Sequence, residues 1–321
     1  MDWTSSSLVE TDWLAERLTN NSTAITPEMR IVDARWRGDG TSSRELYQAG
    51  HVPGAVHLDW QLDLSWTDPR GLRDLLLPPE RFAQVMQAAG IGDETLVVAY
   101  ADTDHSGAAR LWWALRYYGH ERVAVVNGGW TKWQAESRPI SRTNPAIPAS
   151  GYHFTPRPRS ELMATATEIK QALEQGQPDV RLVDSRPPEQ YQGQAVWTPS
   201  GSRFLAAGES SIEIGGRSKM RAGHIPGAIS LHAGPLNLNQ SDWTYLPPSI
   251  LRARAEAAGL LPEQRIITYC GVGISASLGL FGLYLAGYRN LALYDASWEE
   301  WGTDPAYPVT IEEPASPNPL P

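Results

Sequence analysis

The only cysteine of the chain, Cys270, lies in a loop where it could act as a nucleophile. It stands between an apolar, strand-like segment, 265–269, and an apolar helical segment, 275–285. Gly271 and Gly273 allow this loop to curl tightly, because glycine tolerates backbone angles that other residues resist. A curl at a helix start points backbone N–H groups inward and forms a small anion-binding nest. We therefore predict that the loop stabilises a thiolate, and also a negatively charged sulfur attached to it.

The same residues leave other roles open for the loop. A lone cysteine under a glycine-rich turn is often a packing residue, and a reactive one can also serve in acyl transfer. A phosphatase loop needs an arginine six residues after the cysteine to clamp the phosphate oxygens, and that position is Ala276 here. A thiol peroxidase or reductase with a resolving cysteine would need a second cysteine, which the sequence does not contain.

The segments that must position this loop occur twice along the chain in the same order. The paired segments are 31–35 and 182–186, 49–55 and 222–228, 96–100 and 265–269, 108–118 and 275–285, 123–126 and 291–294, and 128–133 and 297–301. Within each copy, Val/Ile-rich strands alternate with helical segments, which predicts an α/β fold with a mostly parallel sheet flanked by helices. Sites in such sheets form beyond the carboxyl ends of the strands, where the Cys270 loop lies.

The repeat also predicts the domain boundaries. We expect an amino-terminal domain over residues 8–142, a linker over 143–160, a second domain over 161–308 and a flexible tail over 309–321. The linker holds four prolines, which can continue neither a helix nor a central strand. The offset between the copies grows from 151 residues at the first segment to 173 at the second. This places an insertion of about 22 residues near 196–220, whose glycines and serines favour a loop.

Composition restricts the classes of function further. The formal net charge of -9 argues against a broad nucleic-acid surface, which needs clustered cations. No stretch approaches the roughly 18 consecutive apolar residues of a membrane span, and the first residues do not resemble a signal peptide, so we expect a cytoplasmic protein. The scattered histidines and the single cysteine predict no metal site, and no dinucleotide-binding glycine motif predicts a cofactor.

As a set, these motifs resemble the rhodanese domain. The resemblance covers roughly residues 10–140 and 160–305, and the whole chain is similar to the tandem thiosulfate/3-mercaptopyruvate sulfurtransferases. It implies two rhodanese-like domains, of which the first has lost its cysteine, since Ala101 aligns with Cys270. It also implies transfer of a sulfane sulfur through a Cys270 persulfide to cyanide, a small thiol or a thioredoxin-like protein. A non-catalytic module that carries sulfur or binds a partner is the alternative.

The resemblance implies that the loop residues bind the sulfur donor; they are Gly271, Val272, Gly273, Ile274 and Ser275. Thiosulfate-preferring members tend to carry cations just after the cysteine, and this uncharged loop is closer to the mercaptopyruvate type. One departure is Val272, which replaces the hydroxyl residue of mercaptopyruvate enzymes and removes that proton relay. Ser275 has a hydroxyl, but an N-cap role at the helix start is an equal alternative.

The resemblance assigns roles to three further residues. Arg186 is expected to hold a substrate carboxylate or sulfonate, the alternative being a pair with Asp184 that braces the turn. Family members often carry a second arginine four residues later, where this chain has Gln190. His51 is expected to transfer protons, the alternative being a structural role in its turn, and Trp36 to line the cleft between the domains rather than only pack in a core.

Overall fold

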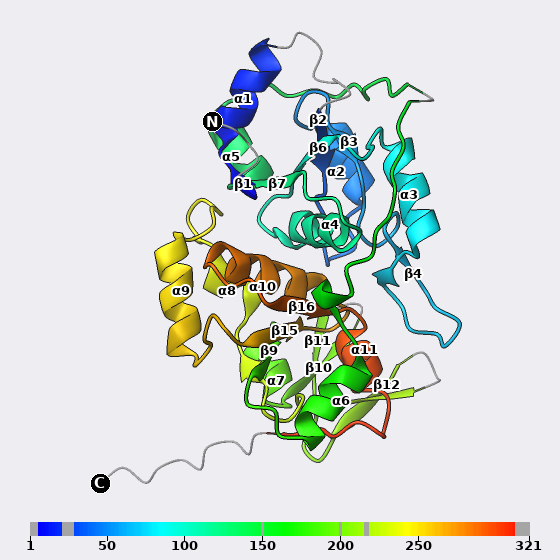
Figure 1. The fold of residues 1–321 in the computed structure, drawn as a ribbon, viewed down its shortest axis with the longest axis vertical. Helices are drawn as coiled ribbons and strands as arrows, with labels where there is room; N and C mark the ends of the chain where they lie inside the picture. The colour runs from blue at the N-terminus through cyan, green and yellow to red at the C-terminus, as the bar shows by residue number, and fades with distance from the viewer. Residues whose placement is uncertain (1–5, 21–28, 149–150, 199–200, 215–217, 312–321) are drawn as a thin grey trace.

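The chain forms two parallel sheets, each flanked by helices, which confirms the predicted α/β fold of two similar domains (Figure 1). This computed structural model describes residues 6–20, 29–148, 151–198, 201–214 and 218–311. The strands are short and rich in β-branched residues, and they are buried on both faces, as strands covered by helices on either side must be.

The two sheets repeat one another strand for strand. The first has the order β1 (Leu8–Val9), β7 (Val123–Val126), β6 (Leu96–Tyr100), β2 (Met29–Asp33), β3 (Val56–His57). The second has the order β8 (Met163–Ala164), β16 (Leu291–Tyr294), β15 (Arg265–Tyr269), β9 (Val180–Asp184), β14 (Ile229–Ser230). All of these neighbours pair in parallel. Strand β15, which leads into the Cys270 loop, therefore occupies the centre of its sheet.

Helices cover both sheets. Those of the first domain are α1 (Thr11–Asn20), α2 (Ser43–Ala49), α3 (Pro79–Ala88), α4 (Ser106–Tyr117) and α5 (Gly129–Ala135). Those of the second are α6 (Ala166–Glu174), α7 (Pro188–Tyr191), α8 (Ala233–Asn237), α9 (Pro248–Ala257), α10 (Ile274–Leu285) and α11 (Ser297–Trp301). A short antiparallel pair, β4 (Ser65–Trp66) and β5 (Leu75–Leu76), projects from the first domain.

The domains pack against each other through equivalent helices, α4 and α10, which lie side by side at the centre of Figure 1. The ring of Trp112 on α4 contacts Phe281 and Tyr284 on α10, with centroid distances of 4.7 and 4.8 Å. One continuous hydrophobic core contains buried residues of both domains. Because α10 begins at the cysteine loop, this interface also borders the candidate site.

His105, which precedes α4, is expected to make the stability of the chain depend on pH. Its side chain is fully buried against Tyr245 of the second domain, and burial lowers its pKa from 6.5 to about 4. The unfolded chain takes up this proton near pH 6.5, whereas the folded chain does so only near pH 4. The free energy of unfolding should therefore fall by about 3 kcal/mol as the pH drops through this window. Urea unfolding at pH 4 to 7 measures how the free energy of unfolding changes with pH. This change should be smaller for His105→Gln than for wild type, and a substitution of the exposed His153 should leave it unaltered.

The insertion of the second domain is not the loop that its composition predicts. It forms two antiparallel hairpins, β10 (Ala195–Thr198) with β11 (Gly201–Phe204), and β12 (Ser211–Ile214) with β13 (Ser218–Arg221). Val196 and Ile212 are buried in the core of the second domain and anchor the hairpins to it. Ala195 and Met220 are buried as well, so a few apolar side chains are enough to order a ribbon whose strand β11 is exposed along its length.

The predicted linker is irregular over most of its described length, up to the 3-10 turn η2 (Ser160–Leu162). Within the tail predicted from residue 309, Thr310 pairs with His224, as Ser141 pairs with His51 in the first domain. Residues 312–321 lie outside the described part of the chain. The exact domain boundaries stay a prediction.

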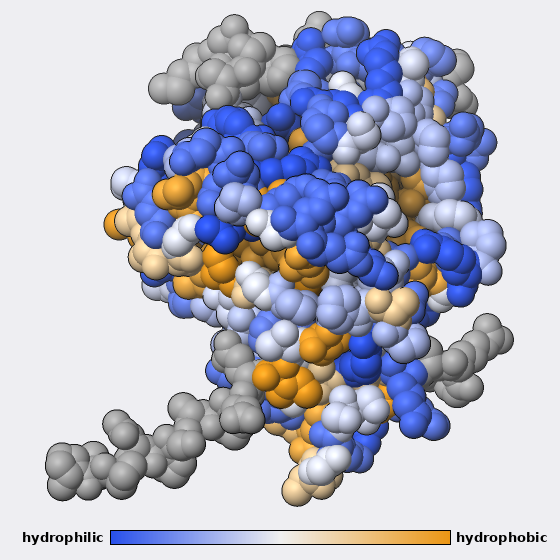
Figure 2. Space-filling model, turned by 60° about the horizontal axis from the view of Figure 1, so that its bottom comes forward, coloured by the Kyte–Doolittle hydropathy of each residue, from blue (hydrophilic) through white to orange (hydrophobic). Residues whose placement is uncertain are grey.

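Hydrophilic residues cover most of the upper part of the face in Figure 2, with hydrophobic groups set across its middle and lower part. Of the large hydrophobic residues described, Leu62 and Phe204 are the most exposed, at 79 % and 66 %. Within the described residues, no helix combines the length and the apolar character that crossing a membrane requires.

Candidate functional site

The Cys270 loop joins β15 to α10 and is fixed to the start of α11. The amide of Cys270 donates to Oγ of Ser297 at 3.1 Å, and its carbonyl accepts from the amide of Trp298 at 3.0 Å. The next carbonyl, that of Gly271, accepts from the amide of Glu299 at 2.9 Å. Gly273 has a φ of 81° and is the N-cap of α10, a conformation that favours glycine. The carbonyl oxygens of the loop's first two residues are thus directed toward α11.

The backbone amides that follow Cys270 remain available to bind an anion. Within the described part of the chain, the N–H groups of residues 271–274 donate to no protein acceptor. Residues 271–273 form the loop directly after the cysteine, and residue 274 is the first residue of α10. The N-terminus of a helix carries partial positive charge. Such unpaired donors next to a thiol are the chemical requirement for holding an anionic sulfur. The orientation of each N–H toward the sulfur stays a prediction.

Aromatic side chains from both domains cover the loop. Trp60 of the first domain packs on Val272 and Ile274, together with Trp36 and Trp197. Trp36 and Trp60 meet edge to face at 5.4 Å, and Trp36 packs against a cluster that contains Val272 and Ile274; its role in lining a substrate cleft stays a prediction. Trp197, in β10 of the insertion, lies on Gly271, where an added Cβ would come within 2.5 Å of its indole. As a result, the Cys270 side chain is only 2 % exposed, more enclosed than the rim of a nest implies.

Sequence reasoning missed Trp60 and Trp197. Thirteen tryptophans in the chain give no local signal that distinguishes these two from core anchors. Trp197 also lies in the insertion, so the repeat offers no counterpart for it. The one available signal for Trp60 was its position shortly after the segment 49–55, which leads into a loop at the carboxyl edge of the sheet.

Arg186 lies beneath the loop and is engaged with protein groups. Its Nε and Nη2 donate to both carboxylate oxygens of Asp184, at 2.6 to 3.1 Å, and Nη2 also donates to the carbonyl of Gly223 at 2.8 Å. The guanidinium is 4.3 Å from the ring centroid of Trp298, and only Nη1 lacks a partner among the described residues. These contacts favour the brace, and the role of Arg186 in holding a substrate stays a prediction.

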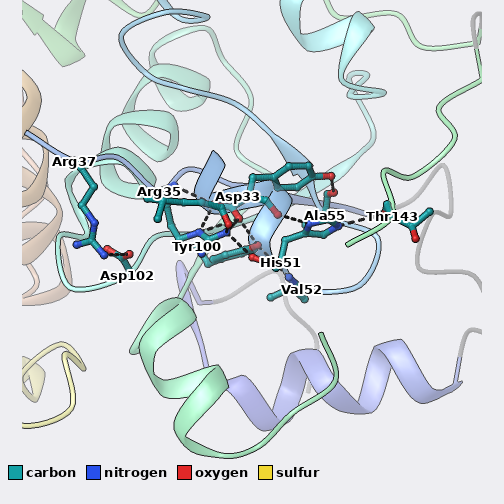
Figure 3. A network of polar contacts seen from close by, with 12 residues as sticks. Asp33, Arg35, Arg37, His51, Val52, Ala55, Tyr100, Asp102 and Thr143 are labelled. Carbon is teal, nitrogen blue, oxygen red and sulfur yellow. Dashed lines mark hydrogen bonds and ion pairs between the residues drawn. The ribbon is translucent and has the colours of Figure 1, made fainter. Parts of the chain in front are cut away.

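The first domain contains the same brace without a cysteine. Arg35 donates to both carboxylate oxygens of Asp33 (Figure 3). It also donates to the carbonyl of Gly50, and its guanidinium lies 4.5 Å from the ring centroid of Trp130. Tyr100 donates to Asp33 at 2.7 Å and closes the network. Because Ala101 stands where the cysteine would be, this arrangement serves the fold of the domain, and Arg186 reproduces it.

Arg186 still contributes charge to the site. Burial lowers the pKa of its guanidinium, but attraction to Asp184, with smaller contributions from Tyr269 and Cys270, outweighs burial and raises the pKa above its ordinary value. The group therefore stays cationic close to Cys270. A fixed buried cation favours a negative charge on the neighbouring sulfur without contacting a substrate.

His51 is also engaged within its own turn. Its Nδ1 lies 2.8 Å from the carbonyl oxygen of Tyr47 and its Nε2 lies 3.3 Å from that of Thr143, and its ring stacks on Tyr47 (Figure 3). His224 repeats the first contact and the stacking with Tyr191. With both ring nitrogens of His51 facing backbone carbonyls, the contacts favour the structural role over proton transfer.

Ser275 lies inside the first turn of α10, so the N-cap role weighed for it is wrong: the N-cap is Gly273. Ser275 instead lines a cavity of about 180 Å³ together with Asp104 of the first domain and Trp243 of the second. The hydroxyl that stabilises the turn is that of Ser277, which donates to the carbonyl of Gly273 at 2.8 Å. Among the described residues, no group of three or more potential ligands could hold a metal ion.

The profile of the Rhodanese-like domain matches this chain twice, over residues 10–136 and 165–304. The chain belongs to the rhodanese family. Both matched regions contain one of the repeated sheets, and the second contains the Cys270 loop. The family resemblance of the sequence motifs is thereby confirmed.

Curated relatives cover nearly the whole of this rhodanese. The thiosulfate sulfurtransferase of Corynebacterium glutamicum is 33 % identical over 95 % of this chain and 91 % of its own length. The probable 3-mercaptopyruvate sulfurtransferase of Pseudomonas aeruginosa is 33 % identical over 95 % and 98 %. A protein named sulfur carrier protein TtuD, from Thermus thermophilus, is 33 % identical over 95 % and 97 %. These names support sulfur transfer as the activity of the family members that this chain matches from end to end.

Solved structures add a relative with different chemistry. The anaerobic ergothioneine biosynthesis enzyme of Chlorobium limicola, solved with trimethyl histidine, superposes with a TM-score of 0.78 at 26 % identity. The match covers 96 % of this chain and 71 % of that enzyme. Another of the similar structures is described as a cysteine persulfide form. The tandem fold thus occurs in proteins named for different substrates, and the fold alone does not define the substrate.

Proposed function

We propose that this rhodanese transfers a sulfane sulfur through a persulfide on Cys270. The observation that carries the proposal is the single cysteine of the chain, placed at the carboxyl end of a central strand and followed by four unpaired amides. The buried Arg186 cation adds to the positive potential at this point. Both features lower the free energy of an anionic sulfur relative to a neutral one.

The reaction has two steps. The thiolate of Cys270 attacks the outer sulfur of the donor, forming one S–S bond while the donor's bond to that sulfur breaks. With thiosulfate, the bonding pair leaves on sulfite; with 3-mercaptopyruvate, it leaves on carbon, which takes the thiol proton and gives pyruvate. The anionic Cys270 persulfide then gives its outer sulfur to a nucleophile, so that cyanide becomes thiocyanate and the thiolate returns. No external oxidant or reductant is required for transfer to cyanide.

We propose 3-mercaptopyruvate as the preferred donor. The loop residues 271–275 carry no cation, and the guanidinium of Arg186 is already paired with Asp184. A thiosulfate dianion would therefore find no unpaired cation on the loop, whereas a donor with a single carboxylate needs less positive charge. Gln190 replaces a second arginine and is buried, with its Nε2 donating to Ser202. For the acceptor we propose cyanide in vitro and a small thiol or a thioredoxin-like protein in a reducing compartment, the cytoplasm.

The enclosure of Cys270 implies that a donor enters by displacing an aromatic side chain. We propose that Trp197 is the movable one. It belongs to the hairpin β10–β11, whose outer strand is exposed along its length, whereas Trp60 is 2 % exposed in the first domain. A shift of this ribbon uncovers Gly271 and the neighbouring sulfur without disturbing either sheet.

The proposal is tested by intact-mass spectrometry and product release. Incubation with a donor should add about 32 Da to the wild-type chain, the mass of one sulfur, and subsequent cyanide should remove it. Cys270→Ser should show neither the adduct nor release of pyruvate or sulfite, while a control substitution at exposed Ser241 should behave as wild type. Turnover by Cys270→Ser equal to wild type would exclude Cys270 as the carrier.

A stoichiometric sulfur carrier is the second candidate function, favoured by the name of the Thermus thermophilus relative. It uses the same persulfide but delivers the sulfur to a protein partner instead of turning over with small acceptors. The two are separated by counting products per chain with excess donor and cyanide. Many thiocyanate molecules per chain indicate an enzyme, and about one indicates a carrier.

A further inference from the structure

Ser297 has a backbone conformation that a serine rarely adopts. Its φ is 50°, in the left-handed region, although it is not a glycine, and it is completely buried. Only a few per cent of non-glycine residues have a positive φ, and each such residue strains the backbone. Glycine is the residue expected at such a position unless the side chain has a role.

The hydroxyl of Ser297 contacts the cysteine loop. Its Oγ accepts the amide proton of Cys270 at 3.1 Å and donates to the carbonyl of Tyr294, at the end of β16, at 2.7 Å. The hydroxyl acts as both acceptor and donor, and it thereby links the ends of the neighbouring strands β15 and β16. Among residues 270–274, only the amide of Cys270 is bound by the protein, while the next four remain available.

The first domain provides the comparison. Gly129 occupies the equivalent position with a φ of 53°, and the amide of Trp130 donates to the carbonyl of Ala101 at 2.7 Å, as Trp298 does to Cys270. A Cβ on Gly129 would come within 2.2 Å of the Ala101 carbonyl oxygen. The same turn therefore forms with glycine in the domain that lacks a cysteine. In the domain that contains Cys270, a serine occupies this position despite its strained backbone.

We propose that Ser297 is a positioning residue for the sulfur-transfer reaction, which fixes the direction of the Cys270 side chain relative to the amides of residues 271–274. The inference rests on the proposed role of Cys270. The hydrogen bond to the Cys270 amide holds the backbone from which the Cα–Cβ bond projects. Without it, the fold persists, but the sulfur no longer lies at a constant distance from the donors that stabilise its charge.

Two substitutions separate this role from a structural one. Ser297→Gly removes the hydroxyl with its two hydrogen bonds and also the strain of the positive φ; these effects oppose each other, so its melting temperature should lie close to that of wild type. Ser297→Ala removes the hydroxyl but keeps the Cβ, so it should melt lower than the glycine variant. Both should lose about tenfold to a hundredfold in kcat with a nearly unchanged KM for the donor, because small misplacement of a reacting group costs this much.

The measurements are steady-state kinetics, thermal melting and the rate of persulfide loading by intact mass. A glycine variant with wild-type kcat, or a loss of kcat that follows melting temperature across the two variants, would overturn the inference. Cys270→Ser, measured alongside, reports separately on the proposed function. If that variant turns over like wild type, the proposed function fails; if it is inactive and Ser297→Gly is fully active, only the role of Ser297 fails.

Discussion

Replacing Arg186 by Met is expected to lower the free energy of unfolding by about 3–5 kcal/mol, because the substitution leaves the carboxylate of Asp184 buried without its cation. The pair is almost completely enclosed, with 2 % of the arginine side chain and none of the aspartate exposed. Its effect should therefore be far larger than that of an exposed ion pair. Urea unfolding followed by circular dichroism measures it directly.

Arg35→Met is the matched control in the domain that lacks a cysteine. Its pair with Asp33 has the same geometry and is equally buried, so a brace predicts a similar loss of stability for both variants. A substrate ligand predicts something else: Arg186→Met would remain as stable as wild type and raise the KM for the donor, while Arg35→Met would not. That outcome would restore the substrate-binding role expected from the family resemblance.

The second large effect is expected for the ion pair that joins the domains beside the loop. Nη1 of Arg110 on α4 lies 2.6 Å from Oδ1 of Asp295, and the two side chains are 1 % and 8 % exposed. The other carboxylate oxygen of Asp295 accepts the amide of Leu76 at 2.8 Å. Arg110→Met leaves this carboxylate buried without a cation and should also cost about 3–5 kcal/mol of unfolding free energy.

The pair between Arg252 and Glu256 is the comparison, because 48 % and 47 % of its side chains are exposed. Breaking it should change stability by less than about 1 kcal/mol. The interdomain pair also packs against Gly273, where an added Cβ would lie 3.0 Å from both Arg110 Nη1 and Asp295 Oδ1. The pair therefore supports the cysteine loop. Equal effects of Arg110→Met and Arg252→Met on the urea midpoint would show that the interdomain pair adds nothing specific.

The features that follow from local pattern could be predicted from the sequence. The alternation of apolar strands and helices, repeated in order, defines two parallel sheets, and the glycines around Cys270 define a tight loop at a helix start. Each of these depends on residues close in the chain, where the spacing itself constrains the backbone. The single cysteine then identifies the candidate nucleophile without any tertiary information.

The contacts that complete the site join segments that are distant in the chain, so the local sequence gives no signal for them. Trp197 meets Gly271 from an insertion whose glycines and serines resemble a loop, and Arg110 meets Asp295 from the other domain. The hydroxyl of Ser297 is informative only once its φ is known, because the sequence shows merely that serine aligns with Gly129. The repeat does hold one unused signal: an Asp-x-Arg turn present in both copies, with the cysteine in only one, already argues that Arg186 braces the fold.

The tryptophan cover over the loop affects how long the thiol survives between reactions. A sulfenic acid formed at Cys270 would find no second cysteine in the chain to capture it as a disulfide, so further oxidation to the irreversible sulfinic acid would inactivate the molecule. With 2 % of the residue exposed, peroxide would reach the sulfur through the hairpin movement proposed above for the donor. On this proposal, the inserted hairpin would link the vulnerability of Cys270 to oxidants to the same opening that admits the donor.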